Sequence, residues 1–222
     1  MKSLVTGGAG FIGSHLVDAL LENGDDVCVL DNFSTGRPEN LAHVQSDLEL
    51  MQCDLAISGS WKKKFDGVSR VFHLAALADI VPSIENPEAY YSANVNGTFN
   101  VMEACKEYGV SKMVYSASSS CYGIPQTFPT SENAEIDPQH PYALTKYLGE
   151  QIVMHWSKVF KIPAISTRFF NVYGPRSRTS GTYGAVFGVF LAQKLSNKPF
   201  TVVGDGNQTR DFTYVTDVVS AL

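Results

Sequence analysis

The chain has 222 residues, a length that fits one or two domains with a buried core. Its 17 Lys and Arg residues are outnumbered by 22 Asp and Glu residues, and the resulting net charge of −5 argues against nucleic acid or an anionic membrane as the main partner. With 44% hydrophobic and 18% charged residues, the composition excludes a disordered or fibrous chain.

The cysteines and the apolar runs exclude further classes. None of Cys28, Cys53, Cys105 and Cys121 belongs to a C-x-x-C pair or has a histidine at metal-ligand spacing. We therefore expect free thiols in a reducing compartment, without a disulfide framework or a metal site. The first apolar run is too short for a signal peptide, and no run reaches the roughly 18 to 20 residues that a membrane helix needs. These observations predict a cytoplasmic protein.

Short apolar runs alternate with longer helical patterns along the chain. Strands are expected at residues 4–6, 27–30, 71–74, 113–115 and 164–167, and helices at residues 11–23, 86–108 and 142–160. Near-continuous apolar strands are typical of a parallel sheet that is covered on both faces. Strand–helix alternation at this rhythm indicates β-α-β units. The predicted fold class is therefore α/β, a Rossmann-type doubly wound parallel sheet.

The composition changes after Thr167, where Arg and turn residues become more frequent. We place a domain boundary there. Residues 1–167 are expected to form the Rossmann domain, and residues 168–222 to begin a smaller region that covers its mouth.

Three further elements are expected in this second region. One helix is predicted to end at Leu195, a turn is predicted at residues 204–206, and a last helix is predicted to begin with Thr216 or Asp217 as its N-cap. Because the chain ends within that helix, we expect the second region to continue beyond Leu222. A short final helix is the alternative.

Three glycines, Gly7, Gly10 and Gly13, follow the first expected strand and open the first helix. Their spacing allows a tight turn, a bare backbone beside a pyrophosphate, and a helix start whose N–H groups face phosphates. Asp31 ends the next strand, 18 residues after Gly13, where a carboxylate binds the adenosine ribose and repels a 2′-phosphate. The pattern predicts a dinucleotide site that favours NAD, although Arg37 lies close enough in sequence to leave NADP open.

Tyr142 and Lys146 stand four residues apart on an expected helix, so that they share one face. The ammonium group and the positive ring of NAD are expected to lower the pKa of the phenol, which then moves a proton while hydride moves to or from the cofactor. A third partner is expected among the serines at residues 116–120, at the carboxyl end of a central strand. The alternative for these serines is that their hydroxyls only bond the backbone.

These motifs occur together in the order of a known family. The segments are residues 7–13, 31–32, 73–76, 116–123, 142–146, 168–176 and 204–212. Spread over the whole chain, they resemble the extended short-chain dehydrogenase/reductases, and among these the NAD-dependent nucleotide-sugar epimerase/dehydratase group. The resemblance implies NAD as cofactor, a UDP-sugar as substrate, and a homodimer joined through the helices near residues 86–108 and 142–160.

The resemblance also implies roles for individual residues. It makes Tyr142 the catalytic base and acid, Lys146 the group that holds the nicotinamide ribose, and Ser118 the hydroxyl that bonds the sugar 4-hydroxyl. The other implied cofactor contacts are Gly7, Gly10, Phe11, Ile12, Gly13, Asp31, Asn32, Gly36, Asp54, Leu55, Leu74, Ala75, Ala76, Asn94 and Phe170. The other implied substrate contacts are Ser83, Ser119, Ser120, Asn171 and Arg210.

The reaction type depends on Ser119 and Ser120, which stand where dehydratases and uronate decarboxylases of this group carry acidic residues. Without a carboxylate there, elimination of water lacks an acid and a base. The resemblance therefore favours epimerisation at C4 of a UDP-hexose, a UDP-N-acetylhexosamine or a UDP-uronate through a 4-keto sugar. Another nucleotide-sugar dehydratase or reductase and a non-catalytic NAD-sensing Rossmann protein are the alternatives.

Overall fold

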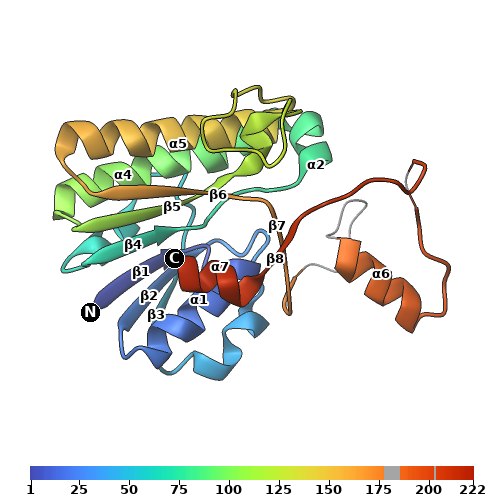
Figure 1. Ribbon diagram of the computed structural model, residues 1–222. Coiled ribbons are helices and arrows are strands. Elements are labelled where there is room, and N and C mark those ends of the chain that lie inside the picture. The colour runs from blue at the N-terminus through green and yellow to red at the C-terminus, as the bar shows by residue number, and fades with distance from the viewer. Residues whose placement is uncertain (178–185, 203) are drawn as a thin grey trace.

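The computed structural model describes residues 1–177, 186–202 and 204–222. Six parallel strands form its central sheet in the order β3-β2-β1-β4-β5-β6 (Figure 1). They are β1 (Lys2–Thr6), β2 (Asp26–Asp31), β3 (Leu48–Gln52), β4 (Arg70–His73), β5 (Lys112–Ser118) and β6 (Ala164–Phe169). The doubly wound α/β fold predicted from the sequence is confirmed, and the five expected strands are each found at their expected places.

Helices cover both faces of the sheet, as its apolar strands require. Helix α1 (Phe11–Glu22) lies on one face beside α7 (Val215–Ala221), and α4 (Gly97–Tyr108) and α5 (Pro141–Phe160) lie on the other (Figure 1). Short 3₁₀ helices occupy Pro38–Asn40, Ala42–Val44, Ser60–Phe65 and Ser119–Tyr122. None of the helices in the described ranges is both long and apolar enough to cross a membrane.

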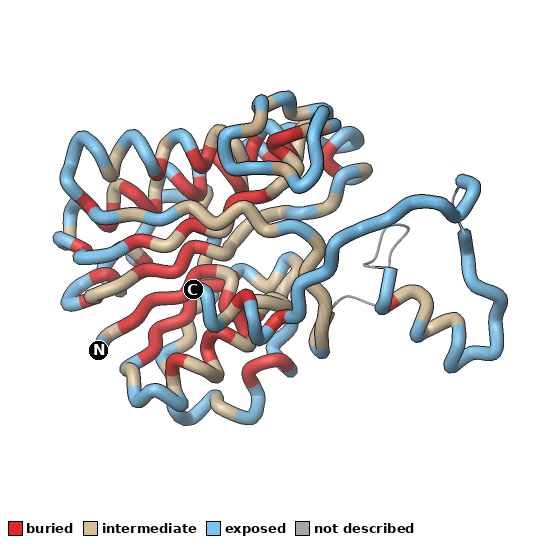
Figure 2. The backbone as a smooth tube through the Cα atoms, viewed as in Figure 1, coloured by how far each residue is buried: buried red, intermediate tan, exposed pale blue. Residues whose placement is uncertain are grey.

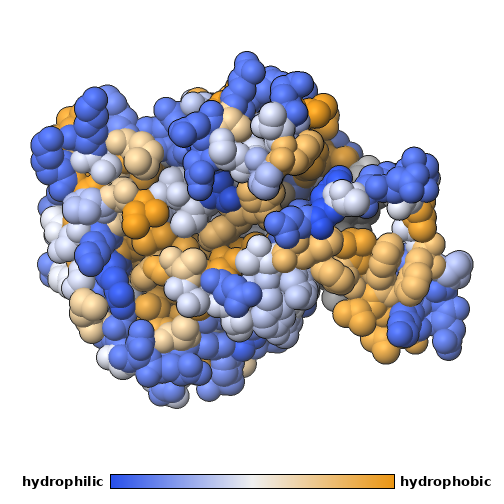
Figure 3. Space-filling model, viewed as in Figure 1, coloured by the Kyte–Doolittle hydropathy of each residue, from blue (hydrophilic) through white to orange (hydrophobic). Residues whose placement is uncertain are grey.

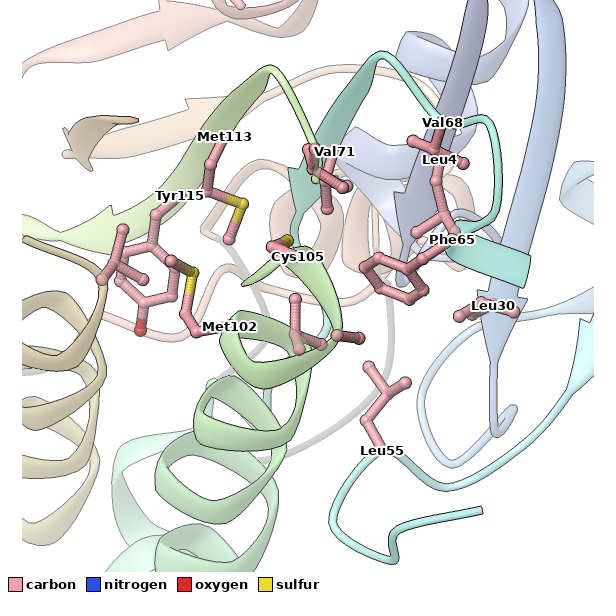
Figure 4. Close-up of a cluster of buried hydrophobic side chains, with 14 of the residues drawn as sticks. Leu4, Leu30, Leu55, Phe65, Val68, Val71, Met102, Cys105, Met113 and Tyr115 are labelled. Atoms are coloured by element: carbon pink, nitrogen blue, oxygen red, sulfur yellow. The ribbon is translucent and has the colours of Figure 1, made fainter. Parts of the chain in front are cut away.

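The alternation of side chains along each strand divides the core into two layers. Leu4 of β1 belongs to the cluster under α4, and the adjacent Val5 belongs to the cluster under α1. Figure 4 shows the first cluster, where Met113 and Tyr115 of β5 meet Met102 of α4. The buried residues in Figure 2 follow the strands and the inner sides of the helices. This double burial fixes the carboxyl ends of the strands, where the candidate site lies.

The helix expected at residues 86–108 is interrupted. It begins as α3 (Pro87–Tyr91), widens into a π-helical turn at Ser92–Asn96, and continues as α4. Asn86 caps α3 by accepting a hydrogen bond from the Ala89 N–H. A π turn adds one residue to a turn of helix and is frequent at functional sites. A shorter helix, α2 (Ile80–Glu85), precedes these elements.

The C-terminal part contains a second, two-stranded parallel sheet. It pairs β7 (Asn171–Tyr173) with β8 (Phe212–Tyr214), and α6 (Val186–Leu195) stands away from the main sheet (Figure 1). Helix α6 ends at Leu195 as predicted. The N-cap prediction for the last helix is wrong, because α7 starts at Val215 directly after β8, and Thr216 and Asp217 lie in its first turn. Figure 3 shows apolar side chains gathered over α6 and over the part of the same chain that lies next to it.

Candidate active site

One cleft with a volume of about 730 Å³ runs along the carboxyl ends of the strands. It brings together most of the residues singled out in the sequence. Those that line it are Gly7, Gly10, Phe11, Ile12, Gly13, Asp31, Asn32, Gly36, Asp54, Leu55, Leu74, Ala75, Ala76, Ser118, Ser119, Ser120, Tyr142, Lys146, Phe170 and Asn171. The dinucleotide loop and the reacting residues therefore share one cavity.

The glycine loop leaves no room for side chains. Gly7 has φ +71, and a Cβ atom there would lie 2.7 Å from the Ala75 nitrogen. A Cβ on Gly13 would lie 2.2 Å from the Gly7 carbonyl oxygen. Gly10 caps α1 without a side chain, so the first N–H groups of the helix are left for a ligand in the cleft. The loop has the bare backbone that a pyrophosphate requires.

Asp31 is buried at the end of β2, where its carboxylate accepts hydrogen bonds from the N–H groups of Ala9 (2.9 Å) and Phe33 (2.8 Å). Burial raises the pKa of this carboxyl group, and the backbone N–H donors oppose that shift. Gly36 lies against both carboxylate oxygens, because a Cβ there would be 3.0 Å from each. Arg37 donates to the Arg176 carbonyl oxygen at 2.9 Å. The carboxylate lines the cleft, as ribose binding requires.

Tyr142 lies in the first turn of α5, which begins at Pro141 after the His140 cap. Its ring stacks on His140 (centroids 5.9 Å apart) and meets Tyr90 edge-on (6.5 Å). Burial raises the pKa of Tyr142, and a hydrogen bond with Ser118 lowers it. Burial is the largest influence on this phenol in the chain by itself, and the lowering expected from Lys146 together with the positive ring of NAD stays a prediction.

Lys146 is buried one turn further along α5. Its Nζ atom lies 4.5 Å from the centroid of the Tyr115 ring, a cation–π contact. Burial lowers the pKa of Lys146 to about 7, against the opposing charge of Glu150. Glu150 is in turn held by Arg168, whose Nε and Nη2 donate to its carboxylate at 3.0 and 2.7 Å. Lys146 can therefore lose its proton near neutral pH, which an exposed lysine does not do.

The serines after β5 turn into the cleft through a short 3₁₀ helix. Ser118 precedes this helix, and its Oγ accepts a hydrogen bond from the Ser120 N–H at 3.2 Å. Ser119 and Ser120 also line the cleft. The described part of the cleft holds carboxylates on another segment, Asp79 and Glu85, which the sequence reasoning did not single out.

The family model for the NAD dependent epimerase/dehydratase family matches residues 3–222. The chain belongs to this family. It is 41% identical over 220 residues to a protein of Methanocaldococcus jannaschii named putative UDP-glucose 4-epimerase, covering 98% of this chain and 71% of that one. A solved UDP-N-acetylglucosamine 4-epimerase from Methanobrevibacter ruminantium superposes with a TM-score of 0.95 at 35% identity, covering 99% and 71% of the chains.

Family members also include enzymes of other reaction types. UDP-glucuronic acid decarboxylase 1 of Arabidopsis thaliana is 37% identical over 229 residues, covering all of this chain and 51% of that protein. Membership in an NAD-dependent family makes NAD the cofactor of this chain. The residues present fit NAD, because the loop forms a cradle that a Cβ at Gly7 or Gly13 would fill, and Asp31 stands at its adenosine end.

Three predicted contacts lie outside the residues that line the cleft. Ser83 is buried in α2, where its hydroxyl donates to the Ile80 carbonyl oxygen at 2.5 Å. Asn94 is buried in the π turn, where its side-chain amide bonds both backbone groups of Leu77. Arg210 is exposed, and its guanidinium donates to the Thr209 carbonyl oxygen. Their assigned roles remain predictions.

Two contacts hold the chain after β7 against helix α1. Arg176 pairs with Asp18 of α1 at 2.8 Å, and His15 of α1 lies 3.0 Å from the Pro175 carbonyl oxygen. Arg176 has φ +63. Sequence reasoning could not find these partners, because Asp18 and Arg176 stand in separate elements with no shared pattern.

Proposed function

We propose that the chain catalyses epimerisation at C4 of a UDP-sugar. The observation that carries this proposal is one cleft that contains the glycine loop, Ser118, Tyr142 and Lys146, with serines rather than carboxylates at positions 119 and 120. The names of the similar proteins from M. jannaschii and M. ruminantium support the same reaction and leave the sugar open between a hexose and an N-acetylhexosamine. A UDP-uronate is the third candidate.

Tyr142 would move the proton of the sugar 4-hydroxyl. Its hydrogen bond with Ser118 favours the phenolate. Ser118 would bond the same sugar oxygen. NAD, when bound, accepts the hydride from C4 and returns it. Lys146 would hold the nicotinamide ribose with its buried ammonium group. The 4-keto sugar would turn over within the cleft, after which the hydride would return to the opposite face of C4 and Tyr142 would return the proton to the oxygen on C4.

The remaining substrate contacts form the second half of the proposal. Asn171 and Arg210 would hold the diphosphate, for which an amide and a guanidinium are suitable donors. Asn171 starts β7, and its Nδ2 donates to the Asp211 carbonyl oxygen at 3.0 Å, so it lies next to the segment that carries Arg210. Residues 168–222 would thus form the beginning of the substrate-binding region, and residues 1–167 the NAD-binding domain.

We also propose a homodimer joined through α4 and α5. Large apolar side chains on the outer side of these helices are 40 to 50% exposed, a level that a second copy would reduce. They are Phe99, Leu144, Met154, Val159 and Phe160. A light-scattering mass of the purified protein checks this proposal, and a monomeric mass would contradict it.

The alternatives differ in their products. A dehydratase would use an acid beside the catalytic serine, where this chain has Ser119 and Ser120, so Asp79 or Glu85 would have to replace it. A non-catalytic NAD sensor would have no use for Ser118, Tyr142 and Lys146 together. The dehydratase would produce a dehydrated 4-keto sugar, and the NAD sensor would produce no reaction.

Proton NMR of the purified protein with UDP-glucose, UDP-N-acetylglucosamine and UDP-glucuronate in separate tubes tests the reaction. A new anomeric signal of the C4 epimer in one tube supports the proposal and names the substrate. A 4-keto-6-deoxy product or loss of CO₂ would replace it with the dehydratase or decarboxylase reaction. No change in any tube after addition of NAD would contradict it.

A further inference from the structure

Buried polar groups form a continuous chain of hydrogen bonds beneath the cleft. The Ala75 N–H donates to Thr6 Oγ1 (3.3 Å), which lies 2.6 Å from His73 Nδ1. Across the ring, His73 Nε2 lies 2.9 Å from Thr98 Oγ1, which donates to the Asn94 carbonyl oxygen at 2.6 Å. We call this chain, from Ala75 through Thr6, His73 and Thr98 to Asn94, the His73 bridge. Its three side chains are no more than 1% exposed.

The bridge fixes the protonation state of the imidazole. The one hydroxyl proton of Thr98 is given to Asn94, so Thr98 can only accept from His73, and Nε2 must carry the proton. Nδ1 is then the acceptor, and the Thr6 hydroxyl donates to it. Burial lowers the pKa of His73 to about 3, with a further contribution from the charge of Lys146, so the ring is neutral.

The bridge anchors the cleft-lining segment at residues 74–77. Thr6 holds this segment at Ala75, directly beside the glycine loop that begins at Gly7. The Asn94 side chain holds it at Leu77, accepting from the Leu77 N–H at 2.9 Å and donating to the Leu77 oxygen at 3.0 Å. Since His73 and Thr98 join Thr6 to Asn94, both anchors belong to one network.

The same network reaches the helix that carries the reacting residues. Asn94 Nδ2 donates to Thr145 Oγ1 at 3.1 Å, and the Tyr115 hydroxyl donates to the Lys146 carbonyl oxygen at 3.2 Å. The His73 ring lies 5.6 Å from the Tyr115 ring, centroid to centroid. The floor of the cofactor cleft and the start of α5 are therefore tied together through buried side chains.

We propose that His73 is a positioning residue. As a neutral imidazole protonated on Nε2, it holds residues 74–77 at a fixed position relative to Lys146, so that NAD binds against a rigid surface of the cleft. The proposal rests on the placement of NAD beside Leu74, Ala75 and Ala76. It does not depend on which sugar is used or on epimerisation. His73 itself touches neither cofactor nor substrate in this role.

The test compares His73→Leu with Ser3→Ala. Ser3 lies at the other end of β1, equally buried, where its hydroxyl donates to Asp25 and accepts from Arg70. Both variants lose buried hydrogen bonds and are expected to lose stability. Only His73→Leu is expected to weaken NAD binding, by about tenfold, because the net contribution of one hydrogen bond corresponds to that factor. Calorimetric titration with NAD in the absence of sugar measures the affinity.

Three further measurements keep the test decisive. Thr98→Val breaks the bridge with a side chain of nearly the same shape as threonine. If His73→Leu fails to fold, Thr98→Val should still fold and should bind NAD more weakly than the wild-type protein. His73→Gln, whose amide has one acceptor and two donors, is expected to recover part of the affinity. The imidazole ¹⁵N spectrum should show a proton on Nε2 and none on Nδ1, unchanged between about pH 5 and 8.

Three results would overturn the proposal. The first is an unchanged NAD affinity in both His73→Leu and Thr98→Val. The second is an equal loss of NAD affinity in Ser3→Ala, which would make the role of His73 merely structural. The third is a proton on Nδ1. None of these results bears on the epimerase proposal, since no sugar is present. Conversely, an inactive wild-type protein that binds NAD with the expected His73 dependence would leave the bridge standing and remove only the epimerase.

Discussion

The two halves of the cleft are built differently. The cofactor half rests on β1 and β2, where Val5 and Val29 are fully buried and Asp31 is fixed by two backbone donors. The substrate half rests on the short β7–β8 sheet, in which Phe212 and Tyr214 are more than one third exposed. Figure 2 shows the same contrast as red strands beside a pale-blue extension. The central sheet therefore holds the cofactor half, whereas the proposed substrate half depends on a short and more exposed sheet.

The largest expected effect lies where the halves meet. Tyr142→Phe removes the proton-transfer group and keeps the ring packed on His140 and Tyr90. Turnover should fall by about 10²- to 10⁴-fold, the usual contribution of a positioned acid or base. Affinities for NAD and for UDP should stay within about twofold, since the variant loses the hydrogen bond of the hydroxyl with Ser118 and keeps the packing of the ring. Normal turnover in this variant would remove Tyr142 from the mechanism.

A change in the cofactor half should leave the substrate half intact. Gly13→Ala places a Cβ 2.2 Å from the Gly7 oxygen, so the loop must open, at a cost of about 1–3 kcal/mol for overpacking. NAD affinity should fall at least tenfold. Gly59→Ala is the control, because no atom lies closer than 3.4 Å to its added Cβ. Equal NAD affinities in the two variants would contradict the assigned phosphate loop.

The converse change affects the substrate half. Asn171→Ala removes an amide that bonds the Asp211 carbonyl and is proposed to hold the diphosphate. The KM for the UDP-sugar should rise about tenfold, the value of one hydrogen bond, while NAD affinity is unchanged. Initial-rate kinetics and NAD titration separate the two. A loss of NAD affinity would show that the halves are coupled through β7.

A further expected effect is a pH dependence of the free energy of unfolding. The pKa of Lys146 is lowered by burial to about 7 in the folded chain, below the ordinary lysine value of 10.5. Between these values the unfolded chain binds the extra proton, so the free energy of unfolding should rise with pH, by at most about 1.4 kcal/mol per pH unit. Lys146→Met should abolish this rise in urea titrations at pH 7 to 10. If the free energy of unfolding rose equally with pH in both proteins, the lowered pKa of Lys146 would be contradicted.

Sequence patterns predicted the elements that depend on local chemistry. The apolar runs place β1 and β2 correctly, and the spacing of Gly7, Gly10 and Gly13 predicts the loop between them. The π turn at Ser92–Asn96 could not be predicted, since one extra residue in a turn leaves the apolar periodicity of the surrounding helix nearly intact. The start of α7 was misplaced for a different reason: β8, which ends immediately before it, pairs with a strand forty residues earlier.

The sequence predicted which residues form the candidate site better than it predicted their pKa values and hydrogen-bond partners. Tyr142, Lys146 and Ser118 reach one cleft because they end a strand or begin a helix at the same edge of the sheet. The pKa of Tyr142 depends on burial, which only the folded chain shows. Asn94 was expected to contact the cofactor, yet its amide is used by Leu77 and Thr145. Sequence spacing gives a residue's neighbourhood and leaves its bonding partners undetermined.

The parallel pairing of β7 with β8 has a consequence for redesign. Asn171 lies opposite Phe212, and Tyr173 opposite Tyr214, so the segment between the two strands leaves at the Tyr173 end of the small sheet and returns at its Asn171 end. Such a crossover has to span the length of the strand pair, which a tight hairpin turn cannot do. A graft of residues 174–211 from another family member would therefore have to keep this crossover, and it would test whether that segment carries the proposed sugar preference.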